Sequence, residues 1–194
     1  MPCAIDFSDV KVERLSEEHD TSRFDCGDED INDFLRKDAL IWQKARIAIT
    51  RVFTYQGDII GFYCASADSL RLNQEEKDNE KTINKKRIRE LPAVKIGRLG
   101  RSVNYKQCYL GKFILEWAIG HIINISKEIG VIYVTVDAYP RRVGWYEKSG
   151  FVKNLHKNYS RKEDNVSMRY CLYNLEGIKY KEKNIKESFQ SRFT

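Results

Sequence analysis

Residues 96–112 read IGRLGRSVNYKQCYLGK, and this stretch decides the fold. The residue pattern predicts a strand at residues 94–103 and an amphipathic helix at residues 111–128, with a loop between them. The apolar positions of that helix lie at helical spacing: Ile114, Trp117, Ala118, Ile122, Ile125 and Ile129. The first N–H groups of such a helix are unpaired and its dipole is positive there, so this strand–loop–helix junction can bind an anion.

Upstream of this stretch, the sequence predicts a short strand, a helix and an antiparallel hairpin. The strand covers residues 11–15, and an aspartate of the turn Asp25-Cys26-Gly27-Asp28 can cap the helix that follows. Apolar residues at helical spacing predict this helix, with one break before Ala45: Ile31, Phe34, Leu35, Ala39 and Trp42. Strands at 47–53 and 59–65 flank a hairpin turn at Gln56-Gly57-Asp58.

Downstream, strands and helices alternate. We expect Gly130 to end the long helix in a left-handed conformation, and residues 131–136 to form a central, buried strand. Residues 143–148 predict a short helix, a further strand begins at Phe151, and residues 167–173 predict the last strand. The pattern indicates a single α/β domain over residues 1–173, without internal repeats.

Two segments fit no core pattern. Residues 73–90 are almost wholly polar, with acids first and then Lys85, Lys86, Arg87 and Arg89. We expect a solvated, partly helical insertion, and a contact of its basic half with a polyanion is the alternative. Residues 174–194 form a Lys-rich C-terminal tail.

The composition is that of a folded protein. Of 194 residues, 42% are hydrophobic and 32% are charged, so the chain can bury a core without disulfides or metals. No apolar run approaches the ~18 residues of a membrane span, and the acidic start lacks the apolar core of a signal peptide. We therefore expect a soluble, cytoplasmic protein.

Charge is unevenly distributed along the chain. The net charge is +6, but residues 1–35 contain three basic and eleven acidic residues, so the remainder carries +14. Such a remainder attracts polyanions, for example nucleic acid or a phosphorylated cofactor. Scattered solubilising charge is the alternative interpretation.

The cysteines indicate free thiols. They are odd in number and widely spread, without a C-x-x-C pair: Cys3, Cys26, Cys64, Cys108 and Cys171. A disulfide framework and a zinc site are therefore excluded, and we expect no metal. The histidines share no ligand spacing with one another or with the cysteines, and no local pattern supports a Cys–His nucleophilic pair: His19, His121 and His156.

Two short motifs point to the chemistry. The loop gives Lys106-x-x-Tyr109-x-Gly111, and the later helix ends as Trp145-Tyr146-Glu147-Lys148-Ser149-Gly150-Phe151. They resemble the pyrophosphate loop Gln/Arg-x-x-Gly-x-Gly/Ala and the FYxKxGF helix ending of the GNAT superfamily of acetyl-CoA-dependent N-acetyltransferases. The middle glycine of the loop is tyrosine here. The resemblance covers roughly residues 10–173 and implies an α/β fold with a GNAT-type mixed, splayed β-sheet flanked by helices.

Three further segments narrow the resemblance: Phe24-Asp25-Cys26-Gly27 with Ile31-Asn32-Asp33-Phe34-Leu35, Gly61-Phe62-Tyr63-Cys64-Ala65-Ser66, and Gly97-Arg98-Leu99-Gly100. In this order they are similar to the F-x-C-G-x-x-x-[IL]-x-x-F-L, GFY-x-x-S and GRLA segments of acetyltransferase toxins from toxin–antitoxin modules. The insertion and the tail depart from the usual compact toxin. The resemblance implies acetylation of the α-amine of an aminoacyl-tRNA, which keeps the amino acid out of translation.

The resemblance also implies roles for individual residues. In the family, backbone N–H groups on the cofactor strand polarise the thioester carbonyl, and the corresponding residues here are Leu99, Gly100 and Arg101. The loop of the family holds the phosphates of acetyl-CoA, and the corresponding residues here are Lys106, Gln107, Cys108, Tyr109, Leu110, Gly111 and Lys112. Tyr146 lies on the helix that the family places beside the sulfur. A tyrosine pKa of ~10 lies above the ~8.5 of a thiol, so Tyr146 can protonate the leaving thiolate. Packing alone is the other interpretation of Tyr146, and no carboxylate stands out as a general base.

Two other functions fit the same residues. One is a GNAT acetyltransferase for a small amine or a protein N-terminus. The other is a non-catalytic module that binds CoA or RNA, for which the tyrosine at position 109 is the main argument. The positive charge beyond residue 35 favours a polyanion over a polyamine as acceptor. We expect acetyl-CoA as donor, no membrane, and tRNA, an antitoxin protein and a second copy of the chain as candidate partners.

Overall fold

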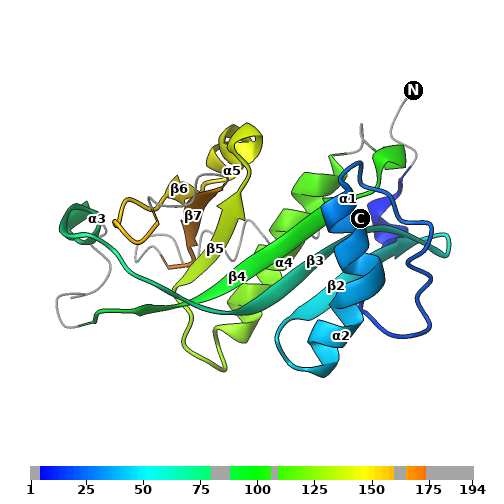
Figure 1. The fold of residues 1–194 in the computed structure, drawn as a ribbon, viewed down its shortest axis with the longest axis horizontal. Helices are drawn as coiled ribbons and strands as arrows, with labels where there is room; N and C mark the ends of the chain where they lie inside the picture. Colours follow the sequence, from blue (N-terminus) through cyan, green and yellow to red (C-terminus); the bar gives the residue numbers. More distant parts are fainter. Residues whose placement is uncertain (1–4, 80–87, 106–108, 160–164, 174–194) are drawn as a thin grey trace. The chain divides into compact units, whose positions relative to one another are not determined.

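The computed structural model describes residues 5–79, 88–105, 109–159 and 165–173. Within these residues the strands form one mixed seven-stranded sheet, in the order β1-β2-β3-β4-β5-β7-β6 (Figure 1). β4 and β5 run parallel, and the other recorded pairs run antiparallel. The strands are β1 (Lys11–Arg14), β2 (Ile49–Tyr55), β3 (Asp58–Leu70), β4 (Leu91–Arg101), β5 (Tyr133–Ala138), β6 (Val152–Lys153) and β7 (Val166–Cys171).

The described residues divide into two compact units. Unit 1 contains residues 5–66, 96–105 and 109–120, and unit 2 contains residues 67–79, 88–95, 121–159 and 165–173. The boundaries fall within β3, β4 and α4 (Leu110–Ile125). Each unit is therefore described by itself.

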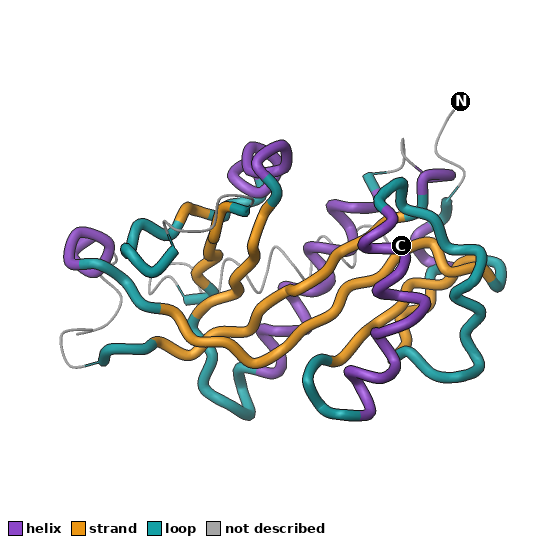
Figure 2. Tube along the Cα trace, in the orientation of Figure 1, coloured by secondary structure: helices purple, strands orange, loops and turns teal. Residues whose placement is uncertain are grey.

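In unit 1, one helical stretch covers one face of β2 and β3. It consists of α1 (Glu29–Asp33), the π-helical turn η2 (Phe34–Asp38) and α2 (Ala39–Lys44), which follow one another without a gap (Figure 2). Phe34 and Leu35 are buried, and the Phe34 ring lies 6.2 Å from that of Phe62 on β3. The predicted helix with one break is confirmed, and the break is the π-helical turn.

The opposite face of the same strands packs against α4. Alternate residues on a strand point to opposite faces, so Phe53 and Tyr63 lie on the face away from Phe62. The Trp117 ring lies 5.7 Å from the Phe53 ring and 6.1 Å from the Tyr63 ring. A Cβ at Gly61 would lie 2.3 Å from Ile114 Cδ1 and 3.1 Å from the Gly100 carbonyl oxygen, so β3 and α4 are closely packed here and a larger residue requires the Ile114 side chain to move.

The predicted hairpin between β2 and β3 is confirmed. Gln56 and Gly57 both have positive φ, +51° and +90°, which is the geometry of a two-residue type I′ turn. This turn matches the right-handed twist of the strands it joins. β3 continues to Leu70, beyond its predicted end at residue 65.

In unit 2, β5 is the buried strand that the sequence predicts. Residues 133–136 are all buried, and β5 pairs with β4 on one side and β7 on the other. The pairing with β4 joins Ala93–Lys95 to Tyr133–Thr135. The short helix α5 (Val143–Lys148) has its predicted bounds.

The predicted end of α4 is wrong. The helix ends at Ile125, Ile129 is 63% exposed, and the positive-φ glycines do not include Gly130. The N–H groups of residues 127 and 128 bond the carbonyls three residues earlier, and the Ser126 hydroxyl donates to the Ile123 carbonyl. These bonds satisfy the last carbonyls of the helix, so a left-handed glycine is not required.

The prediction that residues 73–90 are solvated is wrong for one acidic residue. Glu76, on α3 (Gln74–Asn79), is only 3% exposed and forms an ion pair of 2.6 Å with Arg169, which is 5% exposed. Its carboxylate also accepts the N–H groups of Asn73 and Leu155. Residues 80–87, with Lys85, and the tail 174–194 lie outside the described residues.

Candidate active site

The cofactor strand of the sequence analysis is the end of β4 in unit 1. Leu99 and Arg101 are half-buried, and Gly100 between them is buried. A Cβ at Gly100 would lie 2.8 Å from the Phe62 ring and 3.1 Å from the Ile31 side chain. Residue 100 therefore packs closely against its neighbours, and a side chain at this position requires the Phe62 ring to shift.

Tyr109 stands directly before α4, at the position where the family motif has glycine. Its φ is +50°, a left-handed conformation that costs a residue with a Cβ about 1–2 kcal/mol and costs glycine almost nothing. Its side chain is 83% exposed. The backbone thus has the conformation typical of a glycine, although a tyrosine occupies the position.

The start of α4 has the features of an anion site that the sequence predicts. The first hydrogen bonds of the helix run from the N–H groups of Lys112 and Phe113 to the Tyr109 carbonyl. The N–H groups of Leu110 and Gly111 come before these bonds, at the position where a helix offers N–H groups to an anion. Lys112 is exposed and its Nζ lies 3.7 Å from the Glu116 carboxylate. The remaining predicted loop residues lie outside the described residues: Lys106, Gln107 and Cys108.

Tyr146 lies on α5 in unit 2, among aromatic side chains. Its ring centroid is 4.8 Å from that of Trp145 and 5.2 Å from that of Phe151. Burial raises the pKa of the Tyr146 hydroxyl to about 12, and the positive charge of Arg142 opposes this shift only in part. Within the part of the chain that the structure describes, this hydroxyl forms no hydrogen bond. The Tyr146 hydroxyl is therefore protonated at neutral pH, and its proton is not donated to another group within the described residues.

The predicted site residues thus fall into two groups. Residues 99–101 and 109–112 belong to unit 1, where a strand end and a helix start supply backbone N–H groups. Tyr146 belongs to unit 2. The roles of both groups in catalysis and cofactor binding remain predictions.

Two of the described cysteines are poor nucleophiles. Cys26, Cys64 and Cys171 form no disulfide within the described residues. Burial raises the pKa of Cys64 to about 11 and raises that of Cys26, so both thiols stay protonated at neutral pH. Among the described residues, no group of three or more His, Cys, Asp or Glu side chains could hold a metal ion.

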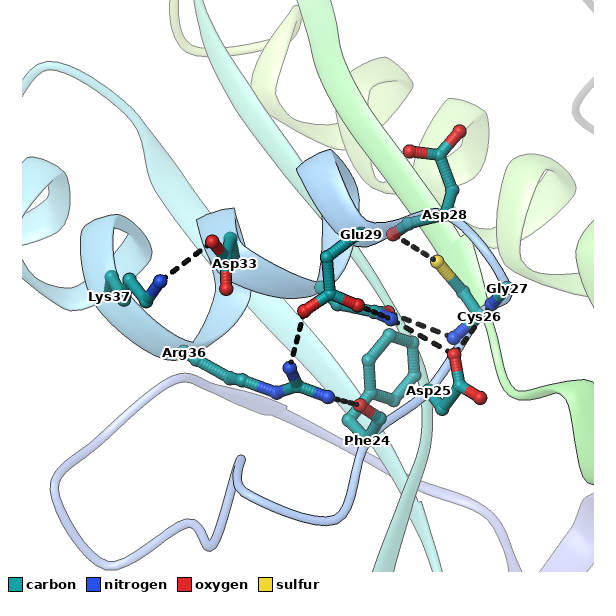
Figure 3. Close-up of polar contacts among 10 residues, drawn as sticks. Phe24, Asp25, Cys26, Gly27, Asp28, Glu29, Asp33, Arg36 and Lys37 are labelled. Atoms are coloured by element: carbon teal, nitrogen blue, oxygen red, sulfur yellow. Dashed lines mark hydrogen bonds and ion pairs between the residues drawn. The ribbon is translucent and has the colours of Figure 1, made fainter.

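One polar network joins the turn before α1 to a residue of that helix (Figure 3), and the sequence does not predict it although the segment matches a family motif. Asn32 is 2% exposed; its Nδ2 donates to Asp25 Oδ1 at 2.9 Å and its Oδ1 accepts the N–H of Cys26 at 2.9 Å. Asp25 Oδ1 also accepts the N–H of Gly27 at 2.7 Å. We call these three hydrogen bonds the Asp25–Asn32 clasp. The turn aspartate thus holds its own turn, and Asp28 makes no side-chain cap on α1.

No described helix is long and apolar enough to cross a membrane. No family model matches the chain. Its fold is similar to that of a tyrosine-to-phenylalanine mutant of KacT, with a TM-score of 0.72 and 17% identity over 93% of this chain and 99% of that one. AtaT complexed with acetyl-methionyl-tRNAfMet gives 0.70 and 18%, over 89% of this chain and 98% of that one.

A third similar structure is a tyrosine-to-phenylalanine mutant of the AtaT toxin bound to the C-terminus of the antitoxin AtaR and acetyl-CoA. It gives a TM-score of 0.67 and 18% identity, over 93% of this chain and 98% of that one. These identities are low, and the likeness is one of fold. The chain has the GNAT-type fold that its motifs indicate, and it shares that fold with the AtaT toxin and KacT.

Proposed function

We propose that this chain is an acetyl-CoA-dependent N-acetyltransferase that acetylates the α-amine of an aminoacyl-tRNA, as the translation-blocking toxin of a toxin–antitoxin pair. The observation that carries the proposal is the shared fold with AtaT, which has been solved with acetyl-methionyl-tRNAfMet and with an antitoxin and acetyl-CoA. The five motif segments of the sequence point to the same family.

Cofactor binding is assigned to the end of β4 and the start of α4. The N–H groups at the start of α4 and the positive end of its dipole suit a pyrophosphate, and the adjacent Lys112 adds a positive charge. The left-handed backbone of Tyr109 supports this assignment, because glycine, the residue of the motif, adopts such a conformation without steric cost. The tyrosine at this position is therefore a weak argument for a non-catalytic module.

The backbone of residues 99–101 is assigned to the reacting carbonyl. Acetyl-CoA supplies the acetyl group as a thioester, and attack by an amine places negative charge on the carbonyl oxygen. Fixed backbone N–H groups stabilise such an oxyanion without reorganisation. The close packing around Gly100 supports this role, because it holds the strand end in one position.

Tyr146 is assigned to the leaving group. As the new C–N bond forms and the C–S bond breaks, its hydroxyl donates a proton to the sulfur, and water then returns a proton to the tyrosine. A pKa of about 12 keeps the hydroxyl protonated at neutral pH. The same pKa is ~3.5 above that of a thiol, so we expect the proton to move only as negative charge develops on sulfur.

The acceptor needs no dedicated base in this scheme. A free α-amine has a pKa of ~7.7–8.0, and an adjacent ester lowers it further, so a large fraction is neutral at pH 7. The attacking nitrogen can lose its extra proton to water. This agrees with a sequence in which no carboxylate stands out as a general base.

Charge favours a nucleic acid as the carrier of that amine. Residues beyond position 35 carry +14, which attracts a polyanion and repels a polyamine. Labelled acetyl-CoA should be offered together with aminoacyl-tRNA, spermidine and a peptide with a free N-terminus. We expect label in tRNA that is released by alkaline deacylation. Label in the peptide or in spermidine alone would instead support the small-amine or N-terminal acetyltransferase.

A further inference from the structure

The Asp25–Asn32 clasp lies against the end of β4. The Asp25 carbonyl accepts the N–H of Val103 at 2.9 Å, two residues after Arg101. A Cβ at Gly27 would lie 3.3 Å from Val103 Cγ1, and a Cβ at Gly100 would lie 3.3 Å from the Phe24 ring. The segment 24–27 therefore lies against Gly100 within β4 and against Val103 beyond its end, on either side of residues 101 and 102.

The clasp determines the path of this segment. Gly27 has a φ of +78°, so the chain turns sharply here, and the side chains of Asp25 and Asn32 hold the turn through the N–H groups of Gly27 and Cys26. Arg36 adds a second tie, because its Nη2 donates to the Phe24 carbonyl at 2.8 Å (Figure 3). Displacement of the turn would displace the Asp25 carbonyl and with it the bond to Val103.

We propose that Asn32 and Asp25 are positioning residues for acetyl transfer, which set the orientation of the backbone N–H groups of residues 99–101 through this turn. The inference rests on the proposed function of those N–H groups. Donors to an oxyanion must be held within ~0.5 Å of the productive geometry, and a misplacement of ~1 Å can reduce the rate 10²-fold. Asp25 and Asn32 stand at x positions of the motif F-x-C-G-x-x-x-[IL]-x-x-F-L, so the motif itself does not specify them.

The test compares three single variants of the clasp and one double variant. Asn32→Ala removes the two hydrogen bonds of Asn32 within the clasp and a third, longer one from its Nδ2 to Glu29 Oε2. Asp25→Ala removes the shared acceptor oxygen. We expect each to lower kcat by about 10–100-fold while the KM for acetyl-CoA changes less than about threefold. Asp25→Asn keeps a side-chain oxygen as acceptor and should retain kcat within about threefold of the parent. The kcat of the double variant, with Asn32→Ala and Asp25→Ala together, should be at most about threefold lower than that of the slower single variant, because both residues act through one turn.

Two controls separate positioning from loss of stability. Asp33→Ala removes an exposed ion pair with Lys37 on the same helical stretch and leaves the clasp intact (Figure 3). Val52→Ala weakens the buried core under that stretch and also leaves the clasp intact. Both should keep the parent kcat at temperatures where they are folded. The proposal is overturned if Val52→Ala lowers kcat as much as Asn32→Ala, or if Asp25→Asn is as slow as Asp25→Ala.

A readout that does not depend on acetyl transfer keeps the inference separate from the proposed function. The backbone amide resonances of Gly100, Arg101 and Val103 should shift in Asn32→Ala and stay near their parent positions in Asp33→Ala. A parent protein without acetyltransferase activity would refute the proposed function but leave this comparison informative. Unchanged resonances in Asn32→Ala would overturn the positioning role even in an active enzyme.

Discussion

Replacing Tyr146 by phenylalanine removes one hydroxyl and keeps the ring. The ring contacts with Trp145 and Phe151, at centroid distances of 4.8 and 5.2 Å, are retained. The hydroxyl forms no hydrogen bond within the described residues, so we expect the free energy of unfolding to change by less than ~0.5 kcal/mol. General acid catalysis contributes ~10²–10⁴-fold, so kcat should fall by that factor, or ~2.7–5.4 kcal/mol in activation free energy.

The assay is acetyl transfer under single-turnover conditions, with urea denaturation of both proteins as the measure of stability. The expected result is a large loss of rate, an acetyl-CoA affinity within a few-fold of the parent, and coincident unfolding curves. A Tyr146→Phe variant that acetylates at the parent rate would refute the reasoning, and water or another residue would then have to supply the proton.

The pH profile gives a second check of the same residue. Activity that requires the protonated hydroxyl is complete below the pKa and is lost as the pH rises through it. Burial raises this pKa to about 12, so the loss should begin only above pH ~11. A decline centred near pH 9–10 that disappears in Tyr146→Phe would contradict the burial of this group.

Three further outcomes test the binding of acetyl-CoA, the buried ion pair and the binding of tRNA. Acetyl-CoA should raise the thermal midpoint of the parent in proportion to the logarithm of its concentration, and Gly111→Asp should abolish the shift by placing a carboxylate beside the pyrophosphate. Glu76→Ala leaves the buried Arg169 without its carboxylate and should cost ~3–5 kcal/mol in urea denaturation, whereas Glu75→Ala on the same helix should cost under ~0.5 kcal/mol. The logarithm of tRNA affinity should fall linearly with that of salt concentration, and charge reversal at residues 85–87 should weaken tRNA binding but not acetyl-CoA binding; equal affinity at low and high salt would exclude an electrostatic interface.

The elements that the sequence predicts well are those set by local periodicity. α5 has its predicted bounds, and the hairpin turn lies at the predicted position, with Gln56 and Gly57 at its centre. The apolar residues between positions 29 and 44 lie at helical spacing, and the predicted break in this helix is a π-helical turn. These features depend on neighbours in sequence, which the pattern contains.

The features that the sequence does not predict depend on residues far apart in the chain. Glu76 lies in a charged run that is typical of a solvated segment, and its partner Arg169 is 93 positions away. Asn32 lies in a recognised motif, but its role depends on the approach of residues 24–27 to Val103. Tyr109 has a left-handed backbone conformation that tyrosine rarely adopts, so its residue type does not predict this conformation. The glycine of the family motif at this position is compatible with it.

The most direct test of the account is the position of the acetyl group after the reaction. Aminoacyl-tRNA treated with the protein and acetyl-CoA should be digested by nuclease, and the released aminoacyl-adenosine analysed by mass spectrometry with fragmentation. The account predicts a gain of one acetyl group, carried on the α-nitrogen, that requires both the protein and acetyl-CoA. An aminoacyl-adenosine of unchanged mass, from a protein that binds acetyl-CoA and tRNA, would contradict it.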